Sequence, residues 1–464
     1  MRELSEKDVE LILIDQKKYY DLQVTRNLDY RVHQLIRLKK GIKKYEKQIL
    51  HALYQDLGKH VNESYMTEIG YCYHSIDYTI RHLKRWARPK KKLSPFYLLP
   101  SIGYISYEPY GSVLIIGPYN YPFQLLIEPL IGSIAAGNTA VLKPSELTPH
   151  VSRVIKRMIE ENFDREYIAC VEGGVDTNTS LLNNAFDYIF FTGSVPVGKI
   201  IMKAAAKRLI PITLELGGKS PVIVDDTADI RQAARRIMWG KTVNAGQTCV
   251  APDYVLVQES VKEQLMKELK RAVVSFYGKD PMSSESFGRI VNQRHFQRIK
   301  AILDADQQSI VYGGQTDEKT RYIAPTIIDL GTDDAASMQE EIFGPLLPVL
   351  TYQNLDDAIR YVQKHPKPLA LYLFTRDRAV ENRVLSRTSS GGACVNDTIM
   401  HLVNPAMPFG GVGNSGIGAY HGRDSFLTFS HRRSVLKKPA RLGNSFMYPK
   451  YTKNQLRLVK LIMH

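Results

Sequence analysis

A single cysteine, Cys249, lies beside Gly246 on a short polar turn formed by residues 244–250. The turn separates a helical pattern that ends near Trp239 from a strand-like run at residues 254–257. A thiolate is a strong nucleophile, and a turn can leave the sulfur exposed at the mouth of a cleft. Most single cysteines are instead small buried hydrophobic residues. Cys249 is therefore a candidate nucleophile whose assignment depends on the residues around it.

A carboxylate in an apolar setting is the second reactive group. Glu215 ends the apolar run 212–216 and directly precedes Gly217 and Gly218. Apolar surroundings raise the pKa of a carboxyl group, so that it can act as a general base near neutral pH. The competing interpretation is a buried glutamate paired with a cation such as Lys219, and the pattern around Glu215 alone favours that pairing.

An amide donor follows the buried strand pattern of residues 112–117. Asn120 lies between Pro118 and Pro122, which restrict the backbone on both sides. A rigid amide N–H can stabilise an oxyanion as it develops. An ordinary turn asparagine is the alternative interpretation.

Two glycine patterns are candidates for phosphate binding. In residues 191–198 a strand enters a glycine turn and a helix begins at Pro196, so free backbone N–H groups can face a pyrophosphate. A literal GxGxxG pattern is formed by Gly411, Gly413 and Gly416, but it neither follows a strand nor opens a helix. We therefore interpret only the first pattern as a nucleotide site.

Lys143 and Glu146 close another strand pattern at the expected ligand edge of the sheet. A carboxylate there can accept hydrogen bonds from both hydroxyls of a ribose, and a lysine can donate to them. The alternative is an ordinary strand-to-turn segment with solvated charges.

Alternating strand and helix patterns from residue 104 to residue 216 must position these groups. Strands that alternate with crossover helices predict a parallel, doubly wound sheet, which binds ligands at the carboxyl ends of its strands. The expected strands are 104–108, 112–117, 140–143, 168–171, 188–191 and 212–215, and the expected helices are 122–136, 151–162 and 197–206.

A second α/β series begins after Gly217 and Gly218 and predicts a second domain of the same kind. Its expected strands are 222–224, 254–257, 346–349 and 371–374, and its expected helices are 229–243, 262–276 and 355–363. Beyond Gly391 the pattern is glycine-rich and irregular. Ahead of the first sheet, residues 6–57 and 63–86 have helical periodicity, while prolines and a charge cluster make residues 88–95 a connector.

Length and cysteine usage limit the class of protein. A chain of 464 residues exceeds one ordinary core, so two or three domains are expected. Four widely spaced cysteines without a CxxC pair favour a reducing, cytoplasmic compartment over a disulfide framework or a zinc site. The N-terminus lacks the apolar core of a signal peptide, and no transmembrane helix is predicted. The cysteines are Cys72, Cys170, Cys249 and Cys394.

The net charge of +15 raises the question of anionic partners. The first hundred residues hold 20 Lys+Arg against 12 Asp+Glu. Many of these basic residues have the helical spacing of a solvated helix face. No zinc-finger or RNA-recognition signature is present, so nucleic-acid binding is not expected. The tail, residues 454–464, is amphipathic and basic, and it is too short to span a bilayer. It fits contact with a membrane surface or docking on a partner subunit.

These motifs together resemble the aldehyde dehydrogenase superfamily over roughly residues 60–435, and the glutamate and cysteine motifs are highly specific. The short N-terminus, residues 56–59 (DLGK), 420–426 (YHGRDSF) and 429–433 (FSHRR) resemble the class 3 branch, which handles fatty and aromatic aldehydes. The matching stretches are 117–122 (GPYNYP), 142–146 (LKPSE), 191–194 (FTGS), 214–221 (LELGGKSP), 244–249 (NAGQTC), 341–345 (EIFGP) and 408–416 (PFGGVGNSG).

The resemblance implies a catalytic role for three of the residues named above. Cys249 would be the nucleophile, Glu215 the general base, and Asn120 the partner of the Cys249 backbone N–H in an oxyanion hole. The reaction would oxidise an aldehyde to a carboxylic acid through a thiohemiacetal and a thioester, with no metal. Candidate pocket residues are Tyr121, Trp239 and His401, which suit an aromatic or medium- to long-chain aliphatic aldehyde.

The resemblance also implies which residues hold the cofactor. Lys143 and Glu146 would bind the adenosine ribose, and Glu341 and Phe343 the nicotinamide riboside. The pyrophosphate region would consist of Gly193, Ser194 and Gly198. Because a carboxylate repels a 2′-phosphate, Glu146 favours NAD, while the nearby lysine leaves NADP possible.

One departure from the family pattern lies in the phosphate turn, where Pro196 is unexpected. At the first helical turn a proline loses little, because its N–H would be unpaired there anyway. It does remove one potential phosphate donor, which bears on the affinity for the cofactor.

The implied domain organisation has three parts. Residues 1–216 form an NAD(P)-binding domain with inserted bridging strands at about 98–110, and residues 217–395 form the catalytic cysteine domain. Residues 396–464 return to form a bridging element and tail through which a homodimer would assemble.

Two other functions compete with this interpretation. The first is a CoA-acylating dehydrogenase on the same scaffold, in which a thiol rather than water accepts the acyl group. Glu215 disfavours it, because a hydrolytic base has little role with a thiol acceptor. The second is a catalytically silent structural or nucleic-acid-binding protein, which the intact set of reactive residues disfavours.

Overall fold

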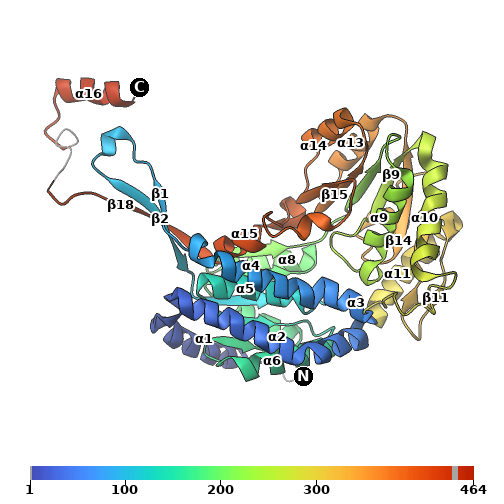
Figure 1. Cartoon of the computed structure of the whole chain (residues 1–464), viewed down its shortest axis with the longest axis horizontal. Coiled ribbons are helices and arrows are strands. Elements are labelled where there is room, and N and C mark those ends of the chain that lie inside the picture. Colours follow the sequence, from blue (N-terminus) through green and yellow to red (C-terminus); the bar gives the residue numbers. More distant parts are fainter. Residues whose placement is uncertain (1–2, 442–447, 464) are drawn as a thin grey trace.

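The computed structural model describes residues 3–441 and 448–463. Two α/β lobes lie side by side, and a thin arm of strands projects from the first (Figure 1). Among the described residues, no helix is both long and apolar enough to cross a membrane.

A six-stranded sheet, in the order β17-β7-β6-β3-β4-β5, forms the first lobe, and all of its strands are parallel except β17. Its middle strands are buried on both faces, as expected where helices cover a parallel sheet. The strands are β3 (Ser112–Ile116), β4 (Thr139–Lys143), β5 (Ile168–Cys170), β6 (Tyr188–Thr192), β7 (Ile212–Glu215) and β17 (Gly416–Ile417).

Helices cover both faces of this sheet. One face packs on α1 (Glu6–Asp21) and α8 (Val195–Ala206) through an apolar cluster of its own. On the opposite face, α5 (Gln124–Ala136) and α6 (Pro149–Asn162) pack on the strands, and α2 (Leu28–Leu57) and α4 (Gly70–Trp86) pack on these two helices. The predicted doubly wound parallel sheet is therefore confirmed.

The second lobe holds a seven-stranded sheet in the order β10-β13-β14-β9-β8-β15-β16. Its core strands are parallel, and helices α9 (Ile230–Thr242), α10 (Lys262–Tyr277), α11 (Gln293–Ala305) and α13 (Leu355–Lys364) pack on them. The strands are β8 (Pro221–Val224), β9 (Tyr254–Gln258), β10 (Ile310–Tyr312), β13 (Thr326–Asp329), β14 (Leu346–Tyr352), β15 (Ala370–Phe374) and β16 (Gly392–Val395).

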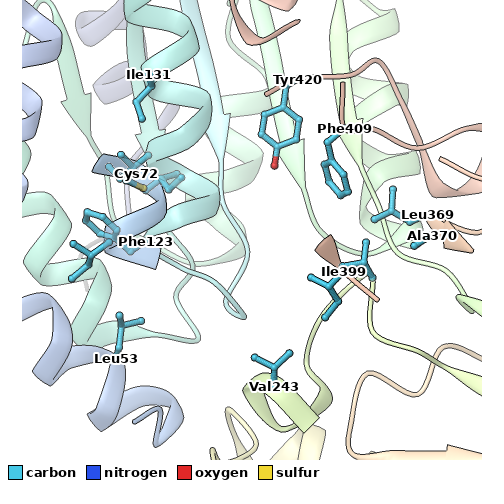
Figure 2. Close-up of a cluster of buried hydrophobic side chains, with 14 of the residues drawn as sticks. Leu53, Cys72, Phe123, Ile131, Val243, Leu369, Ala370, Ile399, Phe409 and Tyr420 are labelled. Carbon is cyan, nitrogen blue, oxygen red and sulfur yellow. The ribbon is translucent and has the colours of Figure 1, made fainter. Parts of the chain in front are cut away.

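One apolar core runs through both lobes. Leu53 and Cys72 from the first lobe belong to the same cluster of buried side chains as Val243, Leu369 and Phe409 (Figure 2). Burial of this continuous core holds the carboxyl ends of the first sheet, followed by Asn120 and ended by Glu215, against the amino ends of the second sheet, where the Cys249 turn precedes β9.

The expected strand 104–108 belongs to β2 (Ile102–Pro109) of the antiparallel arm and not to the parallel sheet. Two further segments differ from the prediction. Residues 88–95 are not only a connector, because Lys90–Lys92 form strand β1, an exposed edge that pairs with β2. Beyond Gly391 the chain is more regular than its glycine content indicates, with β16, α15 (Gly422–Thr428) and β18 (Ser430–Lys437). The three strands β1, β16 and β18 become regular through backbone pairing with another strand, which local composition does not record.

Candidate active site

The Cys249 turn is built by the polar residues of its own motif. Helix α9 ends at Thr242, and the next residues turn sharply because Asn244 and Ala245 take left-handed backbone angles, φ 53° and 52°. The side chain of Gln247 then stabilises the turn with two hydrogen bonds. Its Nε2 donates to the carbonyl of Asn244 at 3.0 Å, and its Oε1 accepts from the N–H of Val291 at 3.0 Å.

Gly246 is required by a close backbone approach. Its φ is 75°, and a Cβ at this position would lie 2.3 Å from the carbonyl oxygen of Gly344. The resulting turn leaves Cys249 half-buried, whereas Cys72, Cys170 and Cys394 are buried. Cys249 thus differs from the other cysteines in the accessibility that a nucleophile needs.

The environment of Cys249 keeps its thiol protonated at rest. Burial, with the nearby carboxyl groups of Glu341 and Glu215, raises the pKa of the thiol to about 12. Attack on a carbonyl therefore requires the proton to leave as the sulfur reacts.

Glu215 ends β7 as a buried carboxyl group without a partner. The residue is 2 % exposed, and neither carboxyl oxygen has a hydrogen-bond partner among the described residues. Burial raises its pKa well above the ordinary value. The competing pairing with Lys219 is wrong, because that ammonium lies 2.6 Å from Asp253 and donates to the carbonyl of Ser337.

The second glycine pattern lies behind this carboxyl group. Gly416 pairs with Glu215 across the antiparallel β17–β7 ladder, and a Cβ on Gly416 would lie 2.4 Å from the carbonyl oxygen of Leu214. Gly416 therefore permits close packing on β7, whereas Gly413 only opens the three-residue 3₁₀ turn Gly413–Ser415, which is too short for a helix N-terminal phosphate site.

Asn120 meets the Cys249 turn directly. The side-chain Nδ2 of Asn120 donates to the backbone carbonyl of Gln247 at 3.0 Å. The backbone carbonyl of Asn120 accepts from Nδ2 of Asn244 at 2.7 Å. One amide hydrogen is thereby fixed, which orients the second. Next to it, the hydroxyl of Tyr121 lies 2.7 Å from the hydroxyl of Thr248.

The expected pyrophosphate turn leads from β6 into the start of α8. Ser194 occupies the N-cap position of α8 without a side-chain hydrogen bond, and Cβ atoms on Gly193 and Gly198 would lie 2.5 Å from the Phe191 ring and 2.7 Å from Leu216, respectively, so both glycines allow close packing of the turn. Pro196 lies in the first turn of α8, as predicted from its missing N–H. Backbone N–H groups at a helix start suit a phosphate, so these residues fit a dinucleotide.

Lys143 and Glu146 form a pair at the end of β4. Nζ of Lys143 lies 3.1 Å from Oε2 of Glu146, and the lysine is buried while its partner is partly exposed. A partly exposed carboxylate held in this way is available to ribose hydroxyls.

Glu341 and Phe343 approach the site from the second lobe. A Cβ on Gly217 would lie 2.2 Å from Oε2 of Glu341, so the carboxyl group rests against the glycine backbone between the lobes. Burial raises the pKa of Glu341 to about 8. Phe343 has a left-handed φ of 48°, and its ring lies edge-on to Tyr119.

The three expected pocket residues, Tyr121, Trp239 and His401, lie in three different surroundings. Tyr121 contacts the Cys249 turn, and Trp239 is half-buried in the last turn of α9. His401 lies against Cys394, with Nδ1 3.2 Å from the sulfur, and burial lowers its pKa to about 4. The imidazole is therefore neutral at physiological pH.

Two groups of residues near the site were not predicted. Lys59, Glu63 and Glu68 hold the backbone around the reactive groups, and Tyr420 lies near Glu215 and Cys249, where burial, with the charges of these two groups, raises its pKa. Residues 56–59 and 420–426 entered the prediction only as a family likeness. None of these four residues has a sequence signal of its own, because each reaches the site through a contact distant in the chain.

A thiol, an unpartnered carboxyl group and an amide donor beside a dinucleotide cradle are the arrangement of a nicotinamide-dependent oxidoreductase that works through a covalent sulfur intermediate. Residues 1–435 match the model of the aldehyde dehydrogenase family. The chain belongs to this family and is an NAD(P)-dependent aldehyde dehydrogenase, which confirms the predicted activity and cofactor class.

Individual relatives agree over nearly the whole chain. The chain is 53 % identical over 452 residues to 4,4'-diaponeurosporen-aldehyde dehydrogenase of Staphylococcus aureus, covering 97 % of this chain and 98 % of that protein. It is 47 % identical to the dimeric NADP-preferring aldehyde dehydrogenase of Rattus norvegicus, covering 89 % and 91 %. A solved structure described as the substrate-bound state of Staphylococcus aureus AldH has a TM-score of 0.96 at 52 % identity, covering 98 % and 99 %.

Proposed function

We propose that Cys249, Asn120 and Glu215 carry the chemistry of aldehyde oxidation. The sulfur of Cys249 attacks the aldehyde carbon while its thiol proton passes to solvent water, and the carbonyl oxygen becomes the oxyanion of a thiohemiacetal. Nδ2 of Asn120 and the backbone N–H of Cys249 stabilise the oxyanion. A nicotinamide held by Glu341 and Phe343 would supply the hydride acceptor for that carbon. A thioester remains on Cys249, and Glu215 takes a proton from the water that hydrolyses it to the carboxylic acid.

The single observation that carries this proposal is the unpartnered carboxyl group of Glu215 near Cys249. A buried carboxyl group without a hydrogen bond costs stability, so its retention indicates a functional role. A raised pKa makes it a base suited to water. This favours hydrolysis over transfer of the acyl group to CoA, and release of acid without CoA would exclude CoA transfer.

We also propose the cofactor contacts from the placement of the residues. Lys143 and Glu146 bind the adenosine ribose, and the pyrophosphate lies at the start of α8 over Gly193, Ser194 and Gly198. Glu341 and Phe343 hold the nicotinamide riboside. Because the Glu146 carboxylate is partly exposed at the ribose position, it favours NAD over NADP.

The proposed substrate is an aromatic or medium- to long-chain aliphatic aldehyde, bound near Tyr121, Trp239 and His401. The relative named for 4,4'-diaponeurosporen-aldehyde supports a large apolar substrate. Because each buried methylene adds about 0.8 kcal/mol of binding, kcat/KM should rise with chain length until the pocket is full.

An NADH-formation screen over straight-chain aldehydes of graded length, with NAD and NADP in parallel, tests substrate class and cofactor preference together. We expect kcat/KM to increase by about threefold or more per methylene over the first members of the series, and to be higher with NAD than with NADP. A preference for the shortest aldehydes would contradict the substrate proposal, and equal use of both cofactors would contradict the role of Glu146.

We propose that the division at residues 1–216, 217–395 and 396–464 describes the domains, and that the chain works in the cytoplasm as a homodimer. Two features of the arm support assembly. β2 and β18 form an antiparallel ladder of mostly exposed or partly exposed residues, and Leu93, Phe96 and Leu99 expose apolar side chains in the segment between β1 and β2. Free thiols in all four cysteines fit a reducing compartment.

The tail is proposed to contact a partner subunit or an anionic membrane surface. Residues 430–464 hold nine Lys+Arg and no Asp or Glu, and helix α16 (Lys453–Met463) exposes Leu456 and Leu461. Truncation of the chain after Lys438 distinguishes between the two proposed partners of the tail. A fall in sedimentation mass from dimer to monomer indicates subunit docking, and lost flotation with anionic vesicles indicates membrane contact. If truncation changes neither readout, both roles of the tail are wrong.

A further inference from the structure

A buried ion pair lies behind the oxyanion donor. Nζ of Lys59 is 2.6 Å from Oε1 of Glu68, and both side chains are fully buried. Two charges in a protein interior lose about as much solvation free energy as their attraction returns, so stability alone does not account for such a pair. The backbone atoms that the pair holds indicate its function.

The two members hold opposite ends of the segment that carries Asn120. Lys59 donates to the carbonyl of Asn120 at 3.0 Å, and its ammonium lies 4.0 Å from the centroid of the Tyr121 ring. The second oxygen of Glu68 accepts from the N–H of Phe123 at 2.9 Å and of Gln124 at 3.2 Å. These N–H groups start α5, which has no capping side chain of its own. Residues 120–124 are thus fixed by charge-assisted hydrogen bonds.

A π-helical turn links this pair to the Cys249 turn. Glu63 lies in α3 (Val61–Ser64), and its Oε1 accepts from the N–H of Asn244 at 2.8 Å. Glu68 lies five residues later in a π turn, Tyr65–Ile69. Residues five apart lie about 140° apart around an α-helix, and the wider π turn reduces that angle. One short helical stretch therefore holds both the Asn120 segment and the Cys249 turn.

We propose that Lys59 and Glu68 are positioning residues for aldehyde oxidation, which act through Asn120 by fixing residues 120–124 against the Cys249 turn. The inference rests on the proposed role of Asn120 as oxyanion donor. Lys59 acts on Asn120 directly, because its ammonium donates to the backbone carbonyl of Asn120. The side-chain amide of the same residue must face the reacting oxygen.

The neutral pair Lys59→Met with Glu68→Gln tests this role. It removes both charges together, so that no unpaired charge stays buried, and it keeps the approximate volume of both side chains. We expect the rate constant of the NADH burst to fall by about 10- to 100-fold, because a displacement near 1 Å in a catalytic group costs about that much. The Kd for NAD should stay unchanged.

The Asn120→Ala background distinguishes positioning from general structural damage. Because the ion pair acts through Asn120, its removal should matter little once Asn120 is gone. Introducing Lys59→Met and Glu68→Gln into the Asn120→Ala protein should therefore lower the rate constant of the NADH burst by less than about twofold further. The inference would be overturned if the two substitutions lowered the burst rate constant equally in the wild-type chain and in Asn120→Ala. It would also be overturned if they did not lower it in the otherwise wild-type chain. If Asn120→Ala itself leaves the burst unchanged, the oxyanion role fails as well.

A matched control removes an ion pair elsewhere in the same helical layer. Lys39 on α2 and Asp77 on α4 are also 2.6 Å apart but contact no residue of the site. Lys39→Met with Asp77→Asn should leave the burst at the wild-type rate. A loss as large as that from the Lys59–Glu68 variant would show that any ion pair between these helices matters, and would contradict a specific role.

Discussion

Replacement of Cys249 by alanine is expected to abolish aldehyde oxidation while NAD still binds. The thiol is the only protein group in the proposed mechanism that forms a bond to the aldehyde carbon, so no covalent intermediate with the enzyme can form without it. The loss should reach roughly 10⁴-fold or more in kcat, on the scale seen when a covalent nucleophile is removed. Calorimetric titration with NAD then checks that the dinucleotide cradle in the first lobe is intact.

The matched control for this variant is Cys394→Ala. That thiol lies 3.2 Å from the Nδ1 atom of His401, which makes it the other thiol with an adjacent base. It is buried, and it should be dispensable for turnover. Residual turnover near the wild-type rate in Cys249→Ala, or a complete loss in Cys394→Ala, would contradict the assignment of the nucleophile.

Glu215→Gln is expected to separate the two halves of the reaction. The first half, which ends with NADH and a thioester on Cys249, does not need the base. A burst of NADH should therefore persist, while steady-state turnover falls by about 10²- to 10⁴-fold, which is the usual contribution of a general base. Stopped-flow absorbance of NADH measures both phases in one experiment.

The same variant carries a pH prediction. Glu215 accepts a proton only when it is ionised, and burial raises its pKa well above the ordinary value. Wild-type deacylation should therefore slow as the pH falls through this raised pKa, and this limb of the profile should be absent in Glu215→Gln. An unchanged steady state, or an identical pH profile, would reject the base role.

The sequence points to the proposed reactive residues because their signals are local. Cys249, Asn120 and Gly246 lie within short polar turns between apolar runs. Asn120 follows a strand of the first sheet, and the Cys249 turn precedes β9 of the second sheet. The parallel sheets followed from alternation of strand and helix patterns, with boundaries correct to within a few residues.

What the sequence left open depends on contacts between distant residues. For Glu215 the local pattern favoured an ion pair with Lys219, and only the position of Asp253 shows that this lysine is occupied elsewhere. The strand Lys90–Lys92 has the composition of a solvated connector, and only its antiparallel pairing with residues 103–105 of β2 makes it a strand. Likewise, the π turn that aligns Glu63 and Glu68 has no compositional mark.

The most direct test of the central claim is mass spectrometry of the Glu215→Gln protein, quenched after mixing with aldehyde and NAD. We predict that the intact mass increases by one acyl group and that the proteolytic peptide containing Cys249 carries it. NADH formation without an acyl group on that peptide, or with the acyl group on Cys394, would contradict the account.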